Sequence, residues 1–476
     1  MTHTQIDAAP PVLGSNPSLA SFIAGLRGEV LLRGDAGYEQ ARRIWNGMID
    51  RHPSLIVRCT GTADVIACVN FAREEGLPLA IRSGGHNVAG TAICEDGLVV
   101  DLSAMKGIAI DPARRMVHAG PGLLWGEFDG ATQAFGLATT GGIVTHTGIA
   151  GLTLGGGIGW LMRRHGLTCD NLAAATVVTA DGRCLHTDSS ENPDLFWGLR
   201  GGGGNFGIVT EFEYHVHPVG PRVLAGVILH PAEQARNVLR FYRDYIAAAP
   251  EELTTIVNLR KAPPAPFLPS HLHGRAVIII SVCYAGPLEH GERILAPLRH
   301  FGDPLIDLIQ PTAYTAHQGM FDASVPHGLN YYWKSDYFGP LSDATIDTLI
   351  AHAWQAPSPS SYTILFHLGG AIRRVDGADS AFEDRNAEHA LNINAVWADR
   401  QASEQHISWA RHFWEAINPL STGRVYMNFL GEEGQDRVRA AYGPDKYSRL
   451  TALKAKYDPT NLFRLNQNIP PALSLA

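Results

Sequence analysis

The chain has 476 residues, of which 45% are hydrophobic and 18% charged, and a formal net charge of −8 at pH 7. This composition is that of an ordinary globular protein, and the length exceeds what one hydrophobic core usually supports, so we expect more than one domain. The acidic balance, without clustered Lys and Arg, argues against nucleic acid as a partner, and the most apolar stretch, AVIIISVC from Ala276, is too short to span a membrane.

The N-terminal segment and the cysteines bear on location and on metal binding. Residues 1–28 lack a basic start followed by an apolar core, so we expect no secretory signal and a cytoplasmic location. The six cysteines form no CxxC pair, so we expect neither a metal site nor a disulfide framework. We expect a monomer or a homodimer.

Short strands and glycine-rich turns alternate over the first part of the chain. Five runs are rich in β-branched residues and bounded by Gly, Asp or Pro, which predicts strands at LIVRCTG, LPLAIRSGG, GLVVDLS, MVHAGPG and AATVVTADG. Between the first two, TADVIACVNFAREEG has helical spacing of apolar residues, with Thr62 as the expected cap. The pattern predicts a small mixed fold and not a doubly wound sheet.

Three glycine clusters interrupt this part of the chain: RSGGHNVAG from Arg82, GGIVTHTGIAGLTLGGGIGW from Gly141 and LFWGLRGGGGNFGIVT from Leu195. Serial glycines allow backbone N–H groups to form a concave nest around a pyrophosphate. None of the clusters is a GxGxxG that opens a helix after a first strand, and GxxxxGK[ST] does not occur, which argues against Rossmann and P-loop sites. Together they predict several loops that converge on one dinucleotide.

His86 follows a glycine pair inside the first of these clusters. The 8α-methyl group of a flavin can tautomerise to an electrophilic methide, and a neutral imidazole nitrogen held close to that carbon can add to it. The position of His86 therefore predicts a covalent attachment point for a flavin.

The second part of the chain reads as an antiparallel sheet backed by helices. Strands are predicted at RVLAGVILH, AVIIISVCYAG, NYYWKSDYF, YTILFHLGG and HALNINAVW, and helices at AEQARNVLRFYRDYIAAAP and SDATIDTLIAHAWQA. Such a sheet gives a one-sided wall for a pocket. An amphipathic helix, DRVRAAYGPDKYSRLTALKAKY, and a polar tail, DPTNLFRLNQNIPP, end the chain.

The ordered set of motifs identifies a family. From GDAGYEQARRIWN at Gly34, through the glycine clusters, to RVYMNFL and KYDPTNLFRLNQNIPP, the chain resembles FAD-linked oxidases of the vanillyl-alcohol oxidase class. Within that class it resembles the berberine bridge enzyme group and its bacterial relatives of the 6-hydroxy-D-nicotine oxidase type. The resemblance implies an α+β fold: a two-part FAD-binding domain over 1–220 and 426–476, and a substrate-binding domain over 221–425 with an antiparallel sheet backed by helices.

The resemblance also implies that FAD is bound through an 8α bond to His86. It implies further cofactor contacts from the three glycine clusters and the C-terminal tail, namely Arg82, Ser83, Gly84, Gly85, Asn87, Val88, Gly141, Thr147, Gly148, Gly151, Gly155, Gly157, Val209, Asn466 and Asn468.

Two departures from the family pattern concern the flavin. Val144 stands where many relatives have a cysteine that forms a second bond to the flavin, and valine has no nucleophile, so we expect His86 to be the single covalent link. Thr147 stands where relatives have Val or Leu on the oxygen-reactive side. The use of O₂ therefore stays open between an oxidase and a dehydrogenase.

Two further departures concern proton transfer. Phe429 replaces a tyrosine that relatives often use as a base, and Asn392 lies where relatives carry Glu, Gln or Lys; neither residue can act as a base at neutral pH. The candidates that remain are Tyr426, expected to share a strand face with Asn428, and His146 in the flavin-adjacent loop.

Other polar and aromatic groups can also reach the substrate. His165 takes the place of a tyrosine in relatives, so it can face the active site. The strand NYYWKSDYF turns either Tyr331 with Trp333 or Tyr332 with Lys334 toward the flavin, because alternate residues share a face.

The resemblance implies an FAD-dependent oxidoreductase. It would oxidise a C–H bond next to oxygen or nitrogen in a small organic or natural-product substrate by hydride transfer to FAD, with O₂ as the expected acceptor and H₂O₂ as its product. Two alternatives stay open: an FAD-linked dehydrogenase with another electron acceptor, and a flavin-containing protein that sequesters its ligand without turnover.

Overall fold

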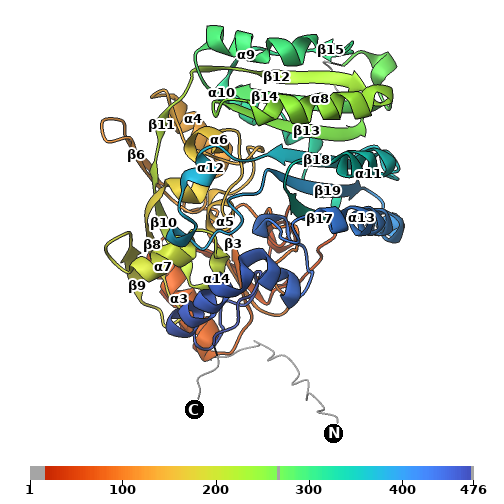
Figure 1. Ribbon diagram of the computed structural model, residues 1–476. Coiled ribbons are helices and arrows are strands. Elements are labelled where there is room, and N and C mark those ends of the chain that lie inside the picture. Colours follow the sequence, from red (N-terminus) through yellow and green to blue (C-terminus); the bar gives the residue numbers. More distant parts are fainter. Residues whose placement is uncertain (1–16, 265–267, 473–476) are drawn as a thin grey trace.

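The computed structural model describes residues 17–264 and 268–472. Residues 1–16, on which the expectation of no secretory signal partly rests, lie outside the described residues. Figure 1 shows two regions: the sheet formed after residue 221 lies above and to the right of the glycine-rich N-terminal part.

Two sheets make up the N-terminal part. One is mixed, with the order β1-β2-β4-β3 and with β4 parallel to both β2 and β3; the other is antiparallel, with the order β5-β6-β10-β8-β9. The five strands predicted here are present, and the fold is not doubly wound. The strands are β1 (Glu29–Leu32), β2 (Leu55–Arg58), β3 (Leu79–Arg82), β4 (Leu98–Asp101), β5 (Ile108–Asp111), β6 (Met116–Ala119), β8 (Leu172–Val178), β9 (Cys184–Thr187) and β10 (Ile208–His215).

Helices of the N-terminal part are mostly short, and β7 (Leu137–Ala138) pairs with β11 (His217–Pro218). The predicted helix is present as α3, but the expected Thr cap is wrong: Gly61 holds the extended cap position and Thr62 is the first helical residue. The helices are α1 (Pro17–Gly25), α2 (Tyr38–Ala41), α3 (Thr62–Glu74), α4 (Trp125–Gln133), α5 (Ile149–Leu154), α6 (Met162–His165) and α7 (Pro193–Leu199).

The third sheet is antiparallel, with the order β15-β12-β14-β13-β18-β19-β17 and with β16 beside β12. The five predicted strands are present; β13, between β14 and β18, was not predicted. The strands are β12 (Arg222–Pro231), β13 (Leu253–Lys261), β14 (Ala276–Tyr284), β15 (Ile306–Asp307), β16 (Gln310–Ala313), β17 (Asn330–Phe338), β18 (Tyr362–His367) and β19 (His389–Trp397).

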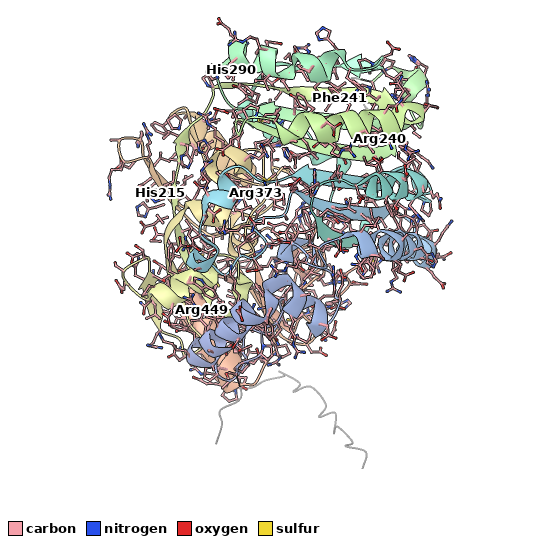
Figure 2. The ribbon with its side chains drawn as sticks, viewed as in Figure 1. His215, Arg240, Phe241, His290, Arg373 and Arg449 are labelled. Atoms are coloured by element: carbon pink, nitrogen blue, oxygen red, sulfur yellow. The ribbon has the colours of Figure 1, made fainter. Side chains whose placement is uncertain are left out.

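Helices cover one face of this sheet, and the other face meets the glycine-rich loops. The covering helices are α8 (Ala235–Ala247), α9 (Leu288–His300), α11 (Asp343–Ala353) and α13 (Ser403–Ile417). In Figure 2 Arg240 marks α8, where its guanidinium Nε lies 3.0 Å from a carboxylate oxygen of Asp343 in α11. The opposite face carries Tyr331 and Phe366 into a core with Trp45 of the N-terminal part. The shorter helices are α10 (Tyr314–Gln318) and α12 (Ala371–Arg374).

The C-terminal helix α14 (Gln435–Tyr457) returns to the N-terminal part. The predicted helix is present but broken at Gly443, whose φ of 69° interrupts it before Pro444. Figure 2 labels Arg449, whose guanidinium lies 3.7 Å from the ring centre of Trp197 in α7. No helix among the described residues is long and apolar enough to cross a membrane. The domain limits, the location and the oligomeric state stay predictions.

Candidate active site

A cavity of about 310 Å³ lies where the glycine clusters meet the inner face of the third sheet. Its walls come from loop residues 83–87, 142–152 and 203–209, from β17, β18 and β19, and from the segments 426–429 and 465–467. Glycines and apolar or aromatic side chains dominate the lining, and among the described lining residues none is Asp, Glu, Lys or Arg.

Gly84 and Gly148 bring the first two glycine clusters into contact beside the cavity. A Cβ atom added to Gly84 would lie 2.4 Å from the amide nitrogen of Gly148, and one added to Gly148 would lie 2.5 Å from that of Gly84. Both positions therefore require glycine. The absence of side chains also leaves backbone available to a ligand in the cavity.

His86 lines this cavity with a ring nitrogen that has no partner. The imidazole stacks on Trp45, with 4.2 Å between ring centres and an angle of 16°. Nε2 is buried and makes no hydrogen bond. Burial, with smaller contributions from His146 and His327, lowers the pKa of His86 well below its ordinary value. The imidazole is therefore neutral at physiological pH, which is the nucleophilic form.

The cavity collects most of the predicted cofactor residues. Those that line it are Ser83, Gly84, Gly85, His86, Asn87, Thr147, Gly148, Gly151, Val209 and Asn466, together with Val144. Those that do not line it are Arg82, Val88, Gly141, Gly155, Gly157 and Asn468.

The residues outside the lining have other partners. Arg82 is buried, and its Nη2 lies 2.6 Å from Oδ2 of Asp101, so it joins β3 to β4 and does not reach the cavity. Gly155 lies behind Asn428, since a Cβ atom there would come within 2.0 Å of the amide oxygen. In the tail, Gln467 lines the cavity in place of Asn468.

Tyr426 and Asn428 both line the cavity and contact each other. The expected strand is wrong, because Met427–Phe429 form a turn of 3-10 helix. Tyr426 Oη accepts hydrogen bonds from Asn428 Nδ2 at 2.8 Å and from the backbone N–H groups of Gly157 at 2.8 Å and Ile158 at 3.2 Å. Burial raises the pKa of Tyr426 to about 12, although these three donors lower it. The phenol is therefore protonated at neutral pH.

Asparagine amides supply the other polar groups of the cavity. Asn428 Nδ2 also donates to the carbonyl of Leu152 at 3.0 Å, which fixes the orientation of its amide. Asn392 lines the cavity with a buried Oδ1 that has no partner among the described residues. Asn394 lines it as well and was not predicted.

The two candidate histidines lie outside the lining. The ring of His146 is 5.0 Å from that of His86, and both of its nitrogens are buried without partners. Burial and the nearby His327 lower the pKa of His146. His165 stacks on His217 at 3.9 Å and does not reach the cavity.

Strand β17 turns Trp333 toward the cavity. Tyr331 lies on the same face, whereas Lys334 points to the helical side and forms an ion pair with Glu433 at 2.6 Å. The sequence left open which pair faces inward, and the structure selects Tyr331 with Trp333. Tyr362 and Phe366 complete an aromatic wall of the cavity that was not predicted. The sequence YTILFH could have indicated it, because alternate residues of a strand share a face.

Comparisons with known proteins identify the family of this chain. A family model described as an FAD binding domain matches residues 53–188, and one described as berberine and berberine-like matches residues 425–470. An FAD-linked oxidoreductase of Dictyostelium discoideum is 32% identical over 463 residues, which cover 96% of this chain and 98% of the relative. The chain belongs to the berberine bridge enzyme-like family of FAD-linked oxidoreductases.

Other members of the family match over almost the whole chain. The (R)-6-hydroxynicotine oxidase of Paenarthrobacter nicotinovorans is 31% identical, over 94% of this chain and 97% of the relative. The crystal structure of 6-hydroxy-D-nicotine oxidase from Arthrobacter nicotinovorans superposes with a TM-score of 0.84 at 29% identity, over 93% of this chain and 98% of that one. The BBE-like 1 protein of Physcomitrella patens, at 24% identity and a TM-score of 0.86 over 96% and 99% of the chains, shares the fold. The expected fold class, FAD dependence and oxidoreductase class are confirmed.

Proposed function

We propose that this family member holds FAD through a single covalent bond to His86 and oxidises a C–H bond next to oxygen or nitrogen in a small organic substrate. The observation that carries the proposal is the buried, unpartnered Nε2 of a neutral His86 in a glycine-lined cavity that also contains the Tyr426 phenol. Other described histidines also have a buried nitrogen without a partner, but His86 is the one histidine among the described residues that line the cavity.

The residues that line the cavity support the binding of a dinucleotide. Close loop contacts at Gly84 and Gly148 leave backbone exposed to a ligand, and Oδ1 of Asn466 is buried without a partner. These groups would hold FAD together with His86 and Asn87. When bound, FAD accepts the hydride and passes the electrons on, in our proposal to O₂ with formation of H₂O₂.

Tyr426 is the residue we assign to the substrate proton. Three hydrogen-bond donors surround its oxygen and oppose the rise in pKa to about 12 that burial causes, so the phenol is protonated at neutral pH and takes the substrate proton only in its ionised form, which becomes more abundant as pH rises. Asn428 orients the phenol, and the free amide oxygen of Asn392 accepts a hydrogen bond from a substrate O–H or N–H group. The aromatic wall packs against the apolar part of the substrate.

A single flavin link is supported by the residues near His86. Val144 lines the cavity and has no nucleophile. Cys169 is buried outside the lining, and burial raises the pKa of its thiol well above the ordinary value. We therefore assign no cysteinyl bond.

The test has two steps. The purified protein is precipitated in acid, and flavin absorbance is measured in the pellet: wild type and Cys169→Ala should retain the flavin, and His86→Ala should release it. The wild type is then mixed anaerobically with small alcohols and cyclic amines, including the 6-hydroxynicotine named for a relative.

Bleaching of the flavin by an organic substrate, followed by fast recovery in air, is the expected result. Free flavin from wild type, or flavin retained by His86→Ala, would contradict the covalent assignment. Bleaching with slow recovery in air would indicate a dehydrogenase instead, which Thr147 in the cavity lining leaves open.

A further inference from the structure

A row of side chains crosses the inner face of the third sheet and continues beyond the cavity. Trp333 in β17 lies opposite Asn394 in β19, Asn394 lies opposite Tyr362 in β18, and Tyr362 lies opposite Arg260 in β13. The first three line the cavity. Directly opposite residues share a face and have Cβ atoms about 5 Å apart, so Arg260 is the next position outward in the same row.

Arg260 is buried, yet no anion neutralises it. The residue is 8% exposed. Its hydrogen bond among the described residues runs from Nε to the carbonyl of its neighbour Lys261, at 3.3 Å. The guanidinium carbon lies 5.3 Å from the ring centre of Tyr362, and no described carboxylate forms an ion pair with it. Burial lowers the pKa of Arg260, which reflects the cost of holding this charge away from water.

The other buried Lys and Arg side chains in the described part of the chain are compensated. Arg163 donates to backbone carbonyls, including those of Leu253 and Leu368. The remaining four form ion pairs with nitrogen-to-oxygen distances of 2.6 or 2.7 Å: Arg82–Asp101, Lys334–Glu433, Arg385–Asp170 and Lys454–Asp458. Among the described residues, Arg260 is therefore the buried cation whose charge an anionic ligand would neutralise.

We infer that Arg260 binds a carboxylate of the substrate, at the end of the molecule remote from the C–H bond that is oxidised. The substrate class is then an aromatic or cyclic acid whose ring lies along Trp333, Asn394 and Tyr362. Arginine suits a carboxylate because its planar fork matches the two oxygens. A dianionic phosphate is a poorer fit, since Arg260 offers a single positive charge.

The dimensions set a size for this substrate. Two strand spacings of about 4.8 Å separate Arg260 from Asn394, so a molecule that contacts both residues spans about 10 Å. That length corresponds to a ring that carries a short acidic side chain. The inference rests on the proposed function for the reaction itself, but it depends on a different residue and a different measurement.

The test compares acids with their neutral amides on the flavin-containing protein. The probe pairs are benzoate with benzamide, phenylacetate with phenylacetamide, and 3-phenylpropionate with 3-phenylpropanamide. Binding is followed by the change in the visible spectrum of the flavin or, if the flavin is absent, by tryptophan fluorescence. Wild type should bind at least one acid about tenfold or more tightly than its amide, as expected for a charge-assisted pair.

Substitutions at Arg260 and Lys261 test whether the positive charge of Arg260 causes the preference for the acid. Arg260→Gln should abolish the preference for the acid, and Arg260→Lys should restore part of it. Lys261→Gln is the matched control: it removes one positive charge at the next residue, which lies on the other face of the strand, and should keep the preference. No acid that binds more tightly than its amide, or a preference that survives in Arg260→Gln, would overturn the inference.

Thermal stability separates binding from a purely structural role. If the charge serves a ligand, Arg260→Gln should melt at a higher temperature than wild type without ligand, because a buried uncompensated cation is removed. The acid probe should raise the melting temperature of wild type and not of the variant. A lower melting temperature for Arg260→Gln without ligand would instead assign Arg260 to support of Tyr362. If acid releases the flavin from wild type, the proposed covalent link is contradicted. The comparison of acids with their amides still tests Arg260 in that case.

Discussion

Two side chains of the cavity differ in their hydrogen bonds, and the difference underlies the roles that we propose for them. His86 has a buried nitrogen without a partner, as expected for an atom reserved for a ligand, whereas Tyr426 accepts three hydrogen bonds. The residue types and their order in the sequence predicted both positions. The three donors to Tyr426 could not be predicted, because two of them are backbone N–H groups from a loop more than 250 residues earlier.

At this scale Tyr426→Phe is the informative change. It removes the oxygen that we assign to the substrate proton, so the rate of anaerobic flavin reduction by the substrate should fall about 10²- to 10⁴-fold. The covalent flavin content should not change, because His86 is intact. Stopped-flow absorbance measures the rate. Tyr331→Phe is the control, since Tyr331 donates to the carbonyl of Pro326 outside the cavity lining; equal rates for Tyr426→Phe and wild type would contradict the assignment.

At the scale of elements, the alternation of residue types predicted where strands lie, but it did not predict which side of the sheet each residue faces. All nine residues of β19 are buried, because helices cover one face and the glycine loops the other, so period two does not separate the two sides. The central strand β13 was missed, and with it Arg260. The segment 425–430 reads like a strand by residue type, yet it forms a turn that is closed by a hydrogen bond from the Phe429 N–H to the Tyr426 carbonyl at 2.9 Å.

The packing of α4 against α10 makes a pH-dependent contact. Asp129 in α4 is 1% exposed and accepts a hydrogen bond from Gln318 Nε2 in α10 at 2.7 Å. Burial raises the pKa of Asp129 to about 7, against a smaller lowering by Gln318. The folded protein therefore keeps a proton that the unfolded chain loses above about pH 4, so this carboxyl lowers the stability of the fold as pH rises from about 4 to 7.

Asp129→Asn should remove that dependence. The variant should equal wild type near pH 4 and exceed its free energy of unfolding by about 2–4 kcal/mol at pH 8. Melting temperatures measured across this range test the expectation, with Asp343→Asn on the surface of α11 as a control. Parallel pH profiles for wild type and Asp129→Asn would show that the buried carboxyl does not titrate as described.

At the scale of the whole molecule, residues from both ends of the chain close the cavity. Lys454 in α14 is fully buried, pairs with Asp458 at 2.6 Å and donates to the carbonyl of Asn205 in the third glycine cluster at 2.8 Å. The sequence predicted that the tail meets the cofactor site, because the motifs occur in the family's order. It did not predict which tail residues line the cavity, since that depends on the turn held by Asp458.

Lys454→Met should therefore loosen the tail. The change leaves the buried carboxylate of Asp458 without its cation, and the loss in unfolding free energy should be about 3–5 kcal/mol. Flavin content should fall with it, because Asn466 and Gln467 lose their support. Urea unfolding and flavin absorbance measure both effects. Lys456→Met, at an exposed ion pair with Asp194, should change stability by less than about 1 kcal/mol; similar losses for both variants would contradict the role of the buried pair.

The central claim is that His86 carries the flavin, and mass spectrometry of the protein's own peptides tests it most directly. Trypsin releases residues 83–106, which contain both His86 and Cys94, so fragment ions must locate the added mass. We predict one flavin on this peptide, placed at His86, and none on any cysteine. Flavin mass on Cys94 or on another peptide, or recovery of all the flavin as free FAD, would contradict the account.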